Sequence, residues 1–333
     1  MSGLVGIIAN PASGKDIRRL VAHGSVFDNN EKINIIQRVL LGLEALGIER
    51  VLAMPDISGL AVQARDKARV TLPVELLDFP LKNKASDSTR AAELMAEAGV
   101  GCIVTLGGDG TNRAVAKGCG YVPLVPISTG TNNAFPVMIE GTLAGLAAAV
   151  VAQRLPGVRE AGVRLARRLD VYRDGALIDF ALVDVVAYAE RFVASGAMWE
   201  PEKMRTVVLS RPQPGTIGAS AIGGYLPQAA TNGEQGMWLE LGPGGQPLLA
   251  PIAPGLITEV CIRSWQPLAV GRRGQITCAP AVLALDGERE LPIKEGELIE
   301  IALSQNGPHV VDVRAALQAA GAAGVFLDQT KLK

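Results

Sequence analysis

Three polar loops that contain glycine each follow a short apolar run in the first half of the chain. They are residues 10–15 (Asn-Pro-Ala-Ser-Gly-Lys), 107–111 (Gly-Gly-Asp-Gly-Thr) and 128–133 (Ser-Thr-Gly-Thr-Asn-Asn), called here the first, second and third loops. Hydroxyls, amides and glycine backbone at the start of a helix are groups that bind phosphate and ribose oxygens. The sequence therefore predicts that these loops form a binding site for an anion.

The second loop is the most specific of the three, because it places the carboxylate of Asp109 among glycines. Glycines let the backbone bend sharply and let a phosphate approach the amide hydrogens, and the following helix N-terminus adds partial positive charge. A carboxylate would repel phosphate, so Asp109 needs a function of its own. Two functions fit: it helps to hold a magnesium ion, or it accepts a proton from an attacking hydroxyl. The structural alternative is that Asp109 only caps the next helix.

The other two loops also have structural alternatives. The first loop resembles a phosphate loop, but Ala9 stands where a Walker A glycine would stand and Asp16 follows Lys15. It therefore also fits a polar turn with a solvated lysine. The third loop carries no charge and also fits a turn that caps a following helix.

Strand and helix patterns alternate around these loops. Apolar runs predict strands at residues 4–9, 50–55, 74–79, 102–106 and 122–127, and helical spacing predicts helices at 29–46, 59–68, 86–98 and 143–153. This alternation predicts a doubly wound α/β domain with a parallel sheet over residues 1–140. Ligands bind beyond the carboxyl ends of the strands in such sheets, and all three loops fall there.

The second half of the chain has short runs rich in branched residues, separated by turn signals such as Asp174-Gly175. Residues 141–310 are therefore expected to form a mostly antiparallel β domain. Residues 217–236 have no clear pattern. Residues 311–333 are expected to form a helix and tail that pack back on the first domain.

Carboxylates and arginines in this half are further candidates. Asp184 lies in a strand-like run, so it faces either a cleft between the domains or the solvent side of an edge strand. Asp286-Gly287-Glu288 joins two strand-like runs, and Asp-Gly is the standard signal of a type I′ hairpin. The arginines form either a solvated face or a surface that steers phosphates, and they stand at positions 159, 164, 167 and 168.

Composition excludes several classes of protein. The 333 residues carry a net charge of −1 and 4% aromatics, which argues against a nucleic-acid partner. The four cysteines form no Cys-x-x-Cys pair, which indicates buried reduced thiols, and two histidines exclude a histidine-rich metal site. The N-terminus has no basic leader, and the apolar stretch at 143–152 is shorter than the ~20 residues of a membrane span. We expect a cytoplasmic protein without a membrane partner.

Together these motifs resemble the superfamily of the NAD kinases, diacylglycerol kinases and sphingosine kinases, which share a Gly-Gly-Asp-Gly-Thr loop. The first loop looks like the Asn-Pro-x-Ser/Ala-Gly loop of the lipid kinases and of one branch of ATP-NAD kinases. Residues 130–135 are similar to the lipid-kinase Gly-Thr-Gly-Asn-Asp-Phe, and Asp286-Gly287-Glu288 looks like the Asp-Gly-Glu of the second domain. Within the superfamily, the chain most resembles a branch linked to acetoin catabolism.

The resemblance implies roles for individual residues. Asp109 is expected to be the catalytic proton acceptor, or a carboxylate that holds Mg²⁺. The acceptor, bound between the domains, is expected to contact Asn133, Asp184, Asp286 and Glu288. ATP is expected to be held by the residues Asn10, Ser13, Gly14, Lys15, Gly107, Gly108, Gly110, Thr111, Thr129, Gly130, Thr131 and Asn132.

The resemblance leaves the acceptor open. NAD kinases carry an Asn-Glu or Asn-Asp pair that helps to bind NAD, and the aligned residues here are Val183 and Asp184. The expected function is ATP-dependent phosphorylation of a hydroxyl of NAD or of a related small metabolite by a homo-oligomeric kinase. One alternative is a nucleotide-binding regulatory protein without turnover. Another is a lipid kinase, which the lack of an amphipathic anchor disfavours.

Overall fold

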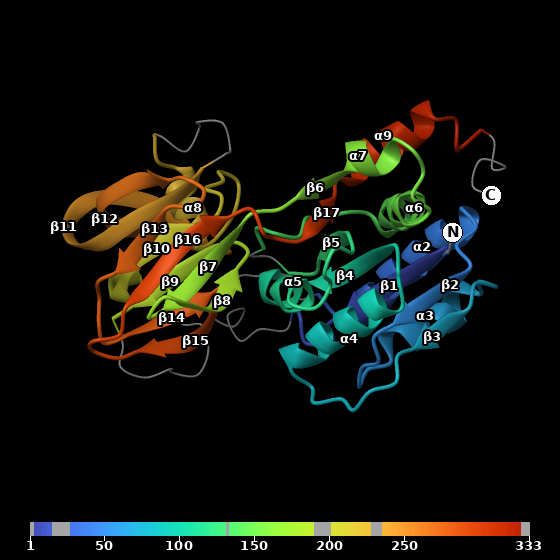
Figure 1. Cartoon of the computed structure of the whole chain (residues 1–333), viewed down its shortest axis with the longest axis horizontal. Coiled ribbons are helices and arrows are strands. Elements are labelled where there is room, and N and C mark those ends of the chain that lie inside the picture. Colours follow the sequence, from blue (N-terminus) through green and yellow to red (C-terminus); the bar gives the residue numbers. More distant parts are fainter. Residues whose placement is uncertain (1–2, 15–26, 131–132, 190–200, 228–234, 328–333) are drawn as a thin grey trace.

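The chain folds into two units that lie side by side (Figure 1). The computed structural model describes residues 3–14, 27–130, 133–189, 201–227 and 235–327. A unit with a mostly parallel sheet lies on the right of Figure 1, and a unit of antiparallel sheets lies on the left. This arrangement confirms the predicted fold class, an α/β domain followed by a mostly antiparallel β domain.

The sheet of the first unit has the strand order β3-β2-β1-β4-β5-β17-β6, in which only the β17–β6 pair is antiparallel. Its strands are β1 (Leu4–Ala9), β2 (Arg50–Ala53), β3 (Val74–Leu76), β4 (Cys102–Gly107), β5 (Leu124–Ser128), β6 (Val163–Leu165) and β17 (His309–Val311). Its helices are α2 (Asn29–Ala45), α3 (Leu60–Ala68), α4 (Ala85–Glu97), α5 (Asp109–Ala116), α6 (Gly141–Ala152), α7 (Val158–Gly162) and α9 (Val313–Ala322).

Helices cover both faces of this sheet. Alternate side chains of a strand point to opposite faces, so Val5 and Ile7 pack with α2, α3 and α6, whereas Leu4 and Ile8 pack with α4 and α5. Both sets are buried. This double burial is why the strands read as continuous apolar runs rather than as alternating patterns.

The strand order reverses between β1 and β4. From β1 the chain proceeds outward to β2 and β3, and it then returns to the other side of β1 through β4 and β5. A crevice forms beyond the carboxyl ends of the strands at such a reversal. The first and second loops begin at this point, so the topology brings them together.

The second unit is a sandwich of two antiparallel sheets with the orders β12-β11-β10-β9-β14-β15 and β13-β16-β7-β8. One apolar core fills the space between them, and α8 covers the outer face of the larger sheet. The elements are β7 (Arg168–Arg173), β8 (Ala176–Ala181), β9 (Asp184–Tyr188), β10 (Met204–Leu209), α8 (Ala219–Gly224), β11 (Gly236–Ala253), β12 (Leu256–Leu268), β13 (Arg273–Ile276), β14 (Ala281–Leu285), β15 (Glu288–Ile293) and β16 (Ile299–Ser304), with a 3-10 turn at Pro201–Lys203.

The boundary between the units differs from the predicted position at residue 140. Helices α6 and α7 pack with the first unit and β6 joins its sheet, so the chain crosses to the second unit only after Leu165. It returns after β16, where β17 enters the first sheet between β5 and β6. His309 of β17 pairs with Leu165 of β6, so the two crossing segments lie side by side (Figure 1). Helix α9 packs against α6 and α7.

Local details differ from the sequence patterns in two places. Strand β9 lies between β10 and β14, so the edge-strand alternative for Asp184 is wrong. Helix α4 starts at Ala85, and Asp87 accepts hydrogen bonds from the amides of the preceding turn at residues 82–84.

None of the described helices has the length and apolar character needed to span a membrane.

Candidate active site

The three loops contact one another directly. Asn10 Nδ2 donates a hydrogen bond of 2.9 Å to Thr111 Oγ1, which joins the first loop to the second. The hydroxyls of Ser13 and Thr129 lie 2.8 Å apart, which joins the first loop to the third. The convergence that the strand ends predicted is therefore built from side-chain hydrogen bonds.

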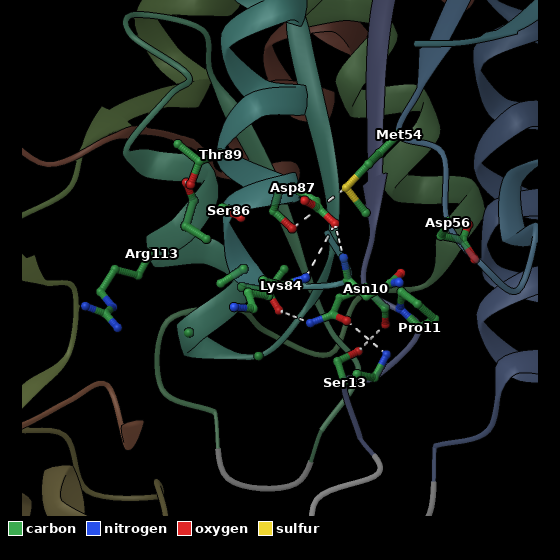
Figure 2. A pocket seen from close by; sticks show the side chains of 18 of the residues that line it. Asn10, Pro11, Ser13, Met54, Asp56, Lys84, Ser86, Asp87, Thr89 and Arg113 are labelled. Carbon is green, nitrogen blue, oxygen red and sulfur yellow. Dashed lines mark hydrogen bonds between the residues drawn. The ribbon is translucent and has the colours of Figure 1, made fainter. Parts of the chain in front are cut away.

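These loops line a cavity of about 1160 Å³. The second unit contributes Asp286 and Glu288, as well as Ala253 and Pro254 from the tip of the β11–β12 hairpin. Figure 2 shows Asn10 and Ser13 on one wall, with other walls formed by the segments that follow β2 and β3. A cavity of this size is large enough for a nucleotide-sized ligand.

Asp109 is the first residue of α5, but its carboxylate bonds to another loop. Oδ1 accepts a hydrogen bond of 2.8 Å from the amide of Phe135, and Oδ1 and Oδ2 lie 3.2 and 3.1 Å from the amide of Ala134. No hydrogen bond from a side chain caps α5 among the described residues. The alternative that Asp109 serves only as a helix cap is therefore wrong.

The environment of Asp109 makes it a stronger base than an ordinary carboxylate. Burial raises the pKa of Asp109 to about 7, and the negative charge of Asp286 acts in the same direction. The amides of Phe135 and Ala134 and the charge of Arg211 oppose this shift without cancelling it. A general base works best when its pKa lies near the working pH, and Asp109 meets that requirement at neutrality.

Asp286 is held by more partners than Asp109. Its carboxylate accepts hydrogen bonds from the amides of Leu182, Val183 and Asp184, the shortest being 2.7 Å, and Oδ2 lies 3.6 Å from Arg113 Nε. Burial raises the pKa of Asp286, whereas Arg113 and the three amides oppose the rise. These donors stabilise the charged form, so Asp286 supplies the negative charge next to Asp109.

The predicted Asp286-Gly287 hairpin turn is confirmed, and it also orients the carboxylate of Asp286. Both residues have positive φ, 51° and 81°, as a type I′ turn requires. The turn joins β14 to β15, and Asp286 is buried in it. The two predictions for this motif, a hairpin turn and a contact with the acceptor, are therefore compatible.

Glycine is required in the second loop because its backbone lies against neighbouring side chains. A Cβ at Gly107 would lie 2.4 Å from Thr111 Cβ, and a Cβ at Gly108 would lie 2.8 Å from Asn133 Oδ1. These distances are far shorter than van der Waals contact. Larger residues would push the second loop away from the first and third loops.

Lys32 supports the backbone of the first loop, and the sequence analysis did not identify this residue. It lies in the first turns of α2, its side chain is fully buried, and Nζ donates to the carbonyls of Asn10, Pro11 and Ser13 at 3.0, 3.1 and 2.6 Å. The Lys32 ammonium thus holds three backbone carbonyls of the first loop toward α2. One signal was available, because Lys32 lies on the apolar stripe of α2 with Ile36 and Val39.

Arg113 was also missed. It follows Asp109 by one helical turn on α5, and its side chain is 5% exposed. Arg113 Nη1 lies 3.4 Å from Asp179 of β8, and Nε contacts Asp286. Lys117, one further turn along, lies 2.8 Å from Asp179. The spacing of Asp109, Arg113 and Lys117 places them on one face of the helix, which was the available signal.

The structure brings most of the predicted site residues to the cavity. Those that line it are Asn10, Ser13, Gly14, Gly108, Asp109, Gly110, Thr111, Gly130, Asn133, Asp286 and Glu288. Gly107, Thr129 and Asp184 are buried and do not line it. Thr129 joins loops through Ser13, and Asp184 contacts Asp286 through its backbone. Lys15, Thr131 and Asn132 lie outside the described residues.

The cavity extends beyond the predicted site to residues 54–58 and 81–90 (Figure 2). These segments follow β2 and β3 at the same edge of the sheet. The rule that located the first three loops therefore also applies to them. They were missed because their residues carry no recognisable motif.

The residues present fit a nucleotide phosphate with Mg²⁺. Gly108, Gly110 and Thr111 line the cavity at the start of α5, and Lys84, Arg90 and Lys117 supply positive charge on the cavity wall. Mg²⁺ is usually bound by one or two carboxylates together with substrate phosphates. Asp109 and Glu288 are carboxylates on this wall.

Comparison with known proteins agrees with this division of the chain into two units. The family model of the ATP-NAD kinase N-terminal domain matches residues 5–155, and that of the acetoin catabolism protein X C-terminal domain matches residues 167–306. The chain thus combines a first domain of the NAD kinase class with a second domain of the acetoin catabolism protein X type. It is 41% identical to acetoin catabolism protein X of Cupriavidus necator, over 96% of this chain and 92% of that protein. The chain belongs to the acetoin catabolism protein X family, and the predicted resemblance is confirmed.

Proposed function

We propose that this protein is a phosphotransferase that transfers a phosphoryl group from ATP to a hydroxyl of a small metabolite, in a process linked to acetoin catabolism. The observation that carries the proposal is the buried carboxylate of Asp109, with a pKa near 7, on the wall of a nucleotide-sized cavity. The ATP-NAD kinase domain and the name of the Cupriavidus necator relative support it.

The first unit binds the donor. Gly108, Gly110 and Thr111 line the cavity at the N-terminus of α5, where phosphate binding is favoured. Asn10 and Ser13 approach from the first loop, together with Lys15, Gly130, Thr131 and Asn132 in our proposal. Asp109 or Glu288 would hold Mg²⁺ together with the phosphates, and the ion would supply charge that neutralises the donor.

Asp109 accepts the proton of the acceptor hydroxyl. Its two amide partners hold the carboxylate in place, and Asp286 keeps the proton affinity high. Phosphoryl transfer requires little covalent chemistry from a protein, so positioning and charge neutralisation supply the remaining catalysis.

The acceptor lies between the units, against Asn133, Asp286 and Glu288. NAD is the first candidate and a related small hydroxylated metabolite is the second. Val183 replaces the asparagine of NAD kinases, and its buried side chain packs with Phe135 and Leu182 in an apolar cluster. It offers no hydrogen bond to an acceptor, which supports testing metabolites other than NAD.

We also propose a cytoplasmic homo-oligomer. The β11–β12 hairpin exposes Leu249 and Ile257, 68% and 64% accessible, on an edge strand pair of the larger sheet. Exposed apolar residues on an edge favour association with another chain.

Replacement of Asp109 by Asn tests the mechanism. Asp109→Asn is expected to abolish phosphoryl transfer while ATP affinity stays within about tenfold, since the amide keeps the shape but cannot accept the proton. Asp66→Asn, an exposed residue of α3, is the matched control and is expected to leave turnover unchanged. Undiminished transfer by purified Asp109→Asn would remove Asp109 from the mechanism.

A nucleotide-binding regulatory protein is the second candidate, and Val183 motivates it. Such a protein would bind ATP tightly and transfer phosphate to no member of a panel of hydroxylated acceptors. A lipid kinase, by contrast, would act only when the acceptor is presented in micelles or vesicles. Turnover assays with both kinds of acceptor separate the three functions.

A further inference from the structure

Arg211 lies next to the candidate base, in a position that the sequence did not reveal. It follows β10 and Ser210, and Ser210 Oγ donates a hydrogen bond of 2.6 Å to the carbonyl of Leu182. The amide of Ser210 donates to the carbonyl of Val183 at 2.9 Å. The Arg211 backbone is therefore fixed against the segment whose amides hold Asp286.

The side chain of Arg211 contacts a residue that binds Asp109. Its Cζ lies 5.7 Å from the centre of the Phe135 ring, and the amide of that same Phe135 donates to Asp109 Oδ1 at 2.8 Å. Arg211 is therefore connected to Asp109 through Phe135, and its positive charge acts on the Asp109 carboxylate.

Within the described part of the chain, the guanidinium of Arg211 is incompletely paired. Nε of Arg211 is buried and makes no hydrogen bond, and none of the described ion pairs includes Arg211. A buried donor without an acceptor is costly, and a buried charge is more so. Such a group is expected where a ligand completes the site.

The charges around Arg211 add to this cost. Burial lowers the pKa of Arg211, and the positive charge of Arg167 acts in the same direction. Asp109 opposes the shift, but its oxygens already accept two amide hydrogen bonds and its pKa is near 7.

We propose that Arg211, with Arg167 beside it, binds an anionic group of the acceptor close to the hydroxyl that Asp109 deprotonates. The assignment of this anionic group to the acceptor rests on the proposed function. Guanidinium groups match the oxygens of phosphate and carboxylate geometrically, and they pair with them more strongly than with neutral acceptors. The site therefore selects hydroxyl compounds that also carry a phosphate or a carboxylate, and it disfavours neutral polyols.

The donor phosphate is the other possible source of the anion, and the geometry disfavours it. Arg211 belongs to the second unit, which contributes acceptor contacts in the proposed function, and it contacts the loop that follows the third loop through Phe135. These observations assign Arg211 to the acceptor side of Asp109.

The experiment measures oxyanion binding to protein whose donor site is already saturated with Mg²⁺ and a non-hydrolysable ATP analogue. Inorganic phosphate and acetate are titrated by calorimetry into the wild-type protein, Arg211→Met, Arg211→Lys and the control Arg205→Met, which removes one positive charge from the same strand. Wild-type protein is expected to bind at least one of the two anions, and the preferred anion distinguishes an acceptor phosphate from an acceptor carboxylate.

Arg211→Met is expected to weaken this binding by about ten- to a hundredfold, as the loss of a charge-assisted hydrogen bond predicts. Arg211→Lys keeps the charge without the planar fork, so a smaller loss is expected, and it provides the comparison should Arg211→Met not fold. Arg205→Met is expected to bind like the wild type.

Three results would overturn the proposal: no binding of either anion by the wild type, unchanged binding by both Arg211 variants, or a loss of affinity for the ATP analogue alone. The last result would assign the anion to the donor. None of these measurements requires turnover, so they are independent of the Asp109→Asn test of the proposed function.

Discussion

Two carboxylates meet at this site, and their surroundings give them different properties. Asp286 accepts three amide hydrogen bonds and faces Arg113, whereas Asp109 accepts from two amides. The amides and Arg113 oppose the rise in the pKa of Asp286 that burial causes, and the negative charge of Asp286 raises the pKa of Asp109. A pair of acids in unequal environments is a common means of dividing catalytic roles, and here it makes Asp109 the group that titrates near neutrality.

Turnover is therefore expected to depend on a single ionisation near neutral pH. The pKa of Asp109 is about 7, so kcat/KM should rise as the pH increases through 7 and then level off, because only the charged form accepts a proton. Arg211→Met should move the midpoint to higher pH, since the positive charge of Arg211 lowers the pKa of Asp109. The profile from pH 5.5 to about 9 checks this, and a profile without a limb in that range would contradict it.

The same ionisation affects stability in the opposite direction. The folded state keeps a proton on Asp109 that the unfolded state releases above its ordinary pKa of about 4, so the contribution of this group to stability falls as the pH rises from about 4 to 7. Denaturation of Asp109→Asn should show a smaller loss of stability over this range. An identical slope in both proteins would place the proton elsewhere.

At the scale of elements, the first loop depends on a helix that it does not belong to. Lys32 of α2 donates to three carbonyls of the loop and so fixes its backbone. Asn10 and Ser13 then connect the loop to the other two. The shape of the donor site is thus set jointly by α2 and by the strand ends.

Lys32→Met keeps the length of the side chain and removes its ammonium. Three half-buried carbonyls then lose a donor, which is expected to lower the free energy of unfolding by about 1–3 kcal/mol. Affinity for the ATP analogue should fall by at least about tenfold, while phosphate binding at Arg211 should persist. Lys67→Met on the exposed face of α3 is the control. Unchanged affinity for the analogue would show that the loop does not need Lys32.

Sequence patterns predicted the elements that carry the site better than they predicted its contacts. Continuous apolar runs marked β1 and β4 because both faces of those strands are buried, and the three loops followed from the strand ends. Arg211 and Lys32 remained hidden because their roles depend on segments distant in sequence. The boundary near Leu165 was missed because β6 is short and pairs with β17, which comes much later in the chain.

At the scale of the whole molecule, α5 fastens the two units together. It begins at Asp109 in the donor site, and Arg113 and Lys117 reach Asp179 and Asp286 of the second unit. Arg113 and Asp179 are 5% and 13% exposed, so this ion pair is screened less by solvent than a surface pair. The helix that carries the proposed base is therefore also the one that connects the two units.

Asp179→Asn is expected to weaken this connection while both cores stay folded. It removes the partner of Arg113 and Lys117, and breaking a largely buried ion pair costs several kcal/mol. Hydrogen exchange measured by mass spectrometry should increase in α5 and β8 and stay constant in β1 and β4. Glu75→Gln, which breaks the exposed pair with Arg50 inside the first unit, serves as the control. Equal exchange in α5 of both variants would show that Asp179 does not hold the units together.

The side-by-side strands β6 and β17 make the second unit an insertion with neighbouring entry and exit points. A domain attached in this way can be exchanged as a whole without changes to the first unit, because both junctions lie next to each other in the sheet of the first unit. Related chains could thus acquire new substrates by replacing this domain alone, and a chimera that carries residues 168–304 of a relative should retain the donor preference of its host.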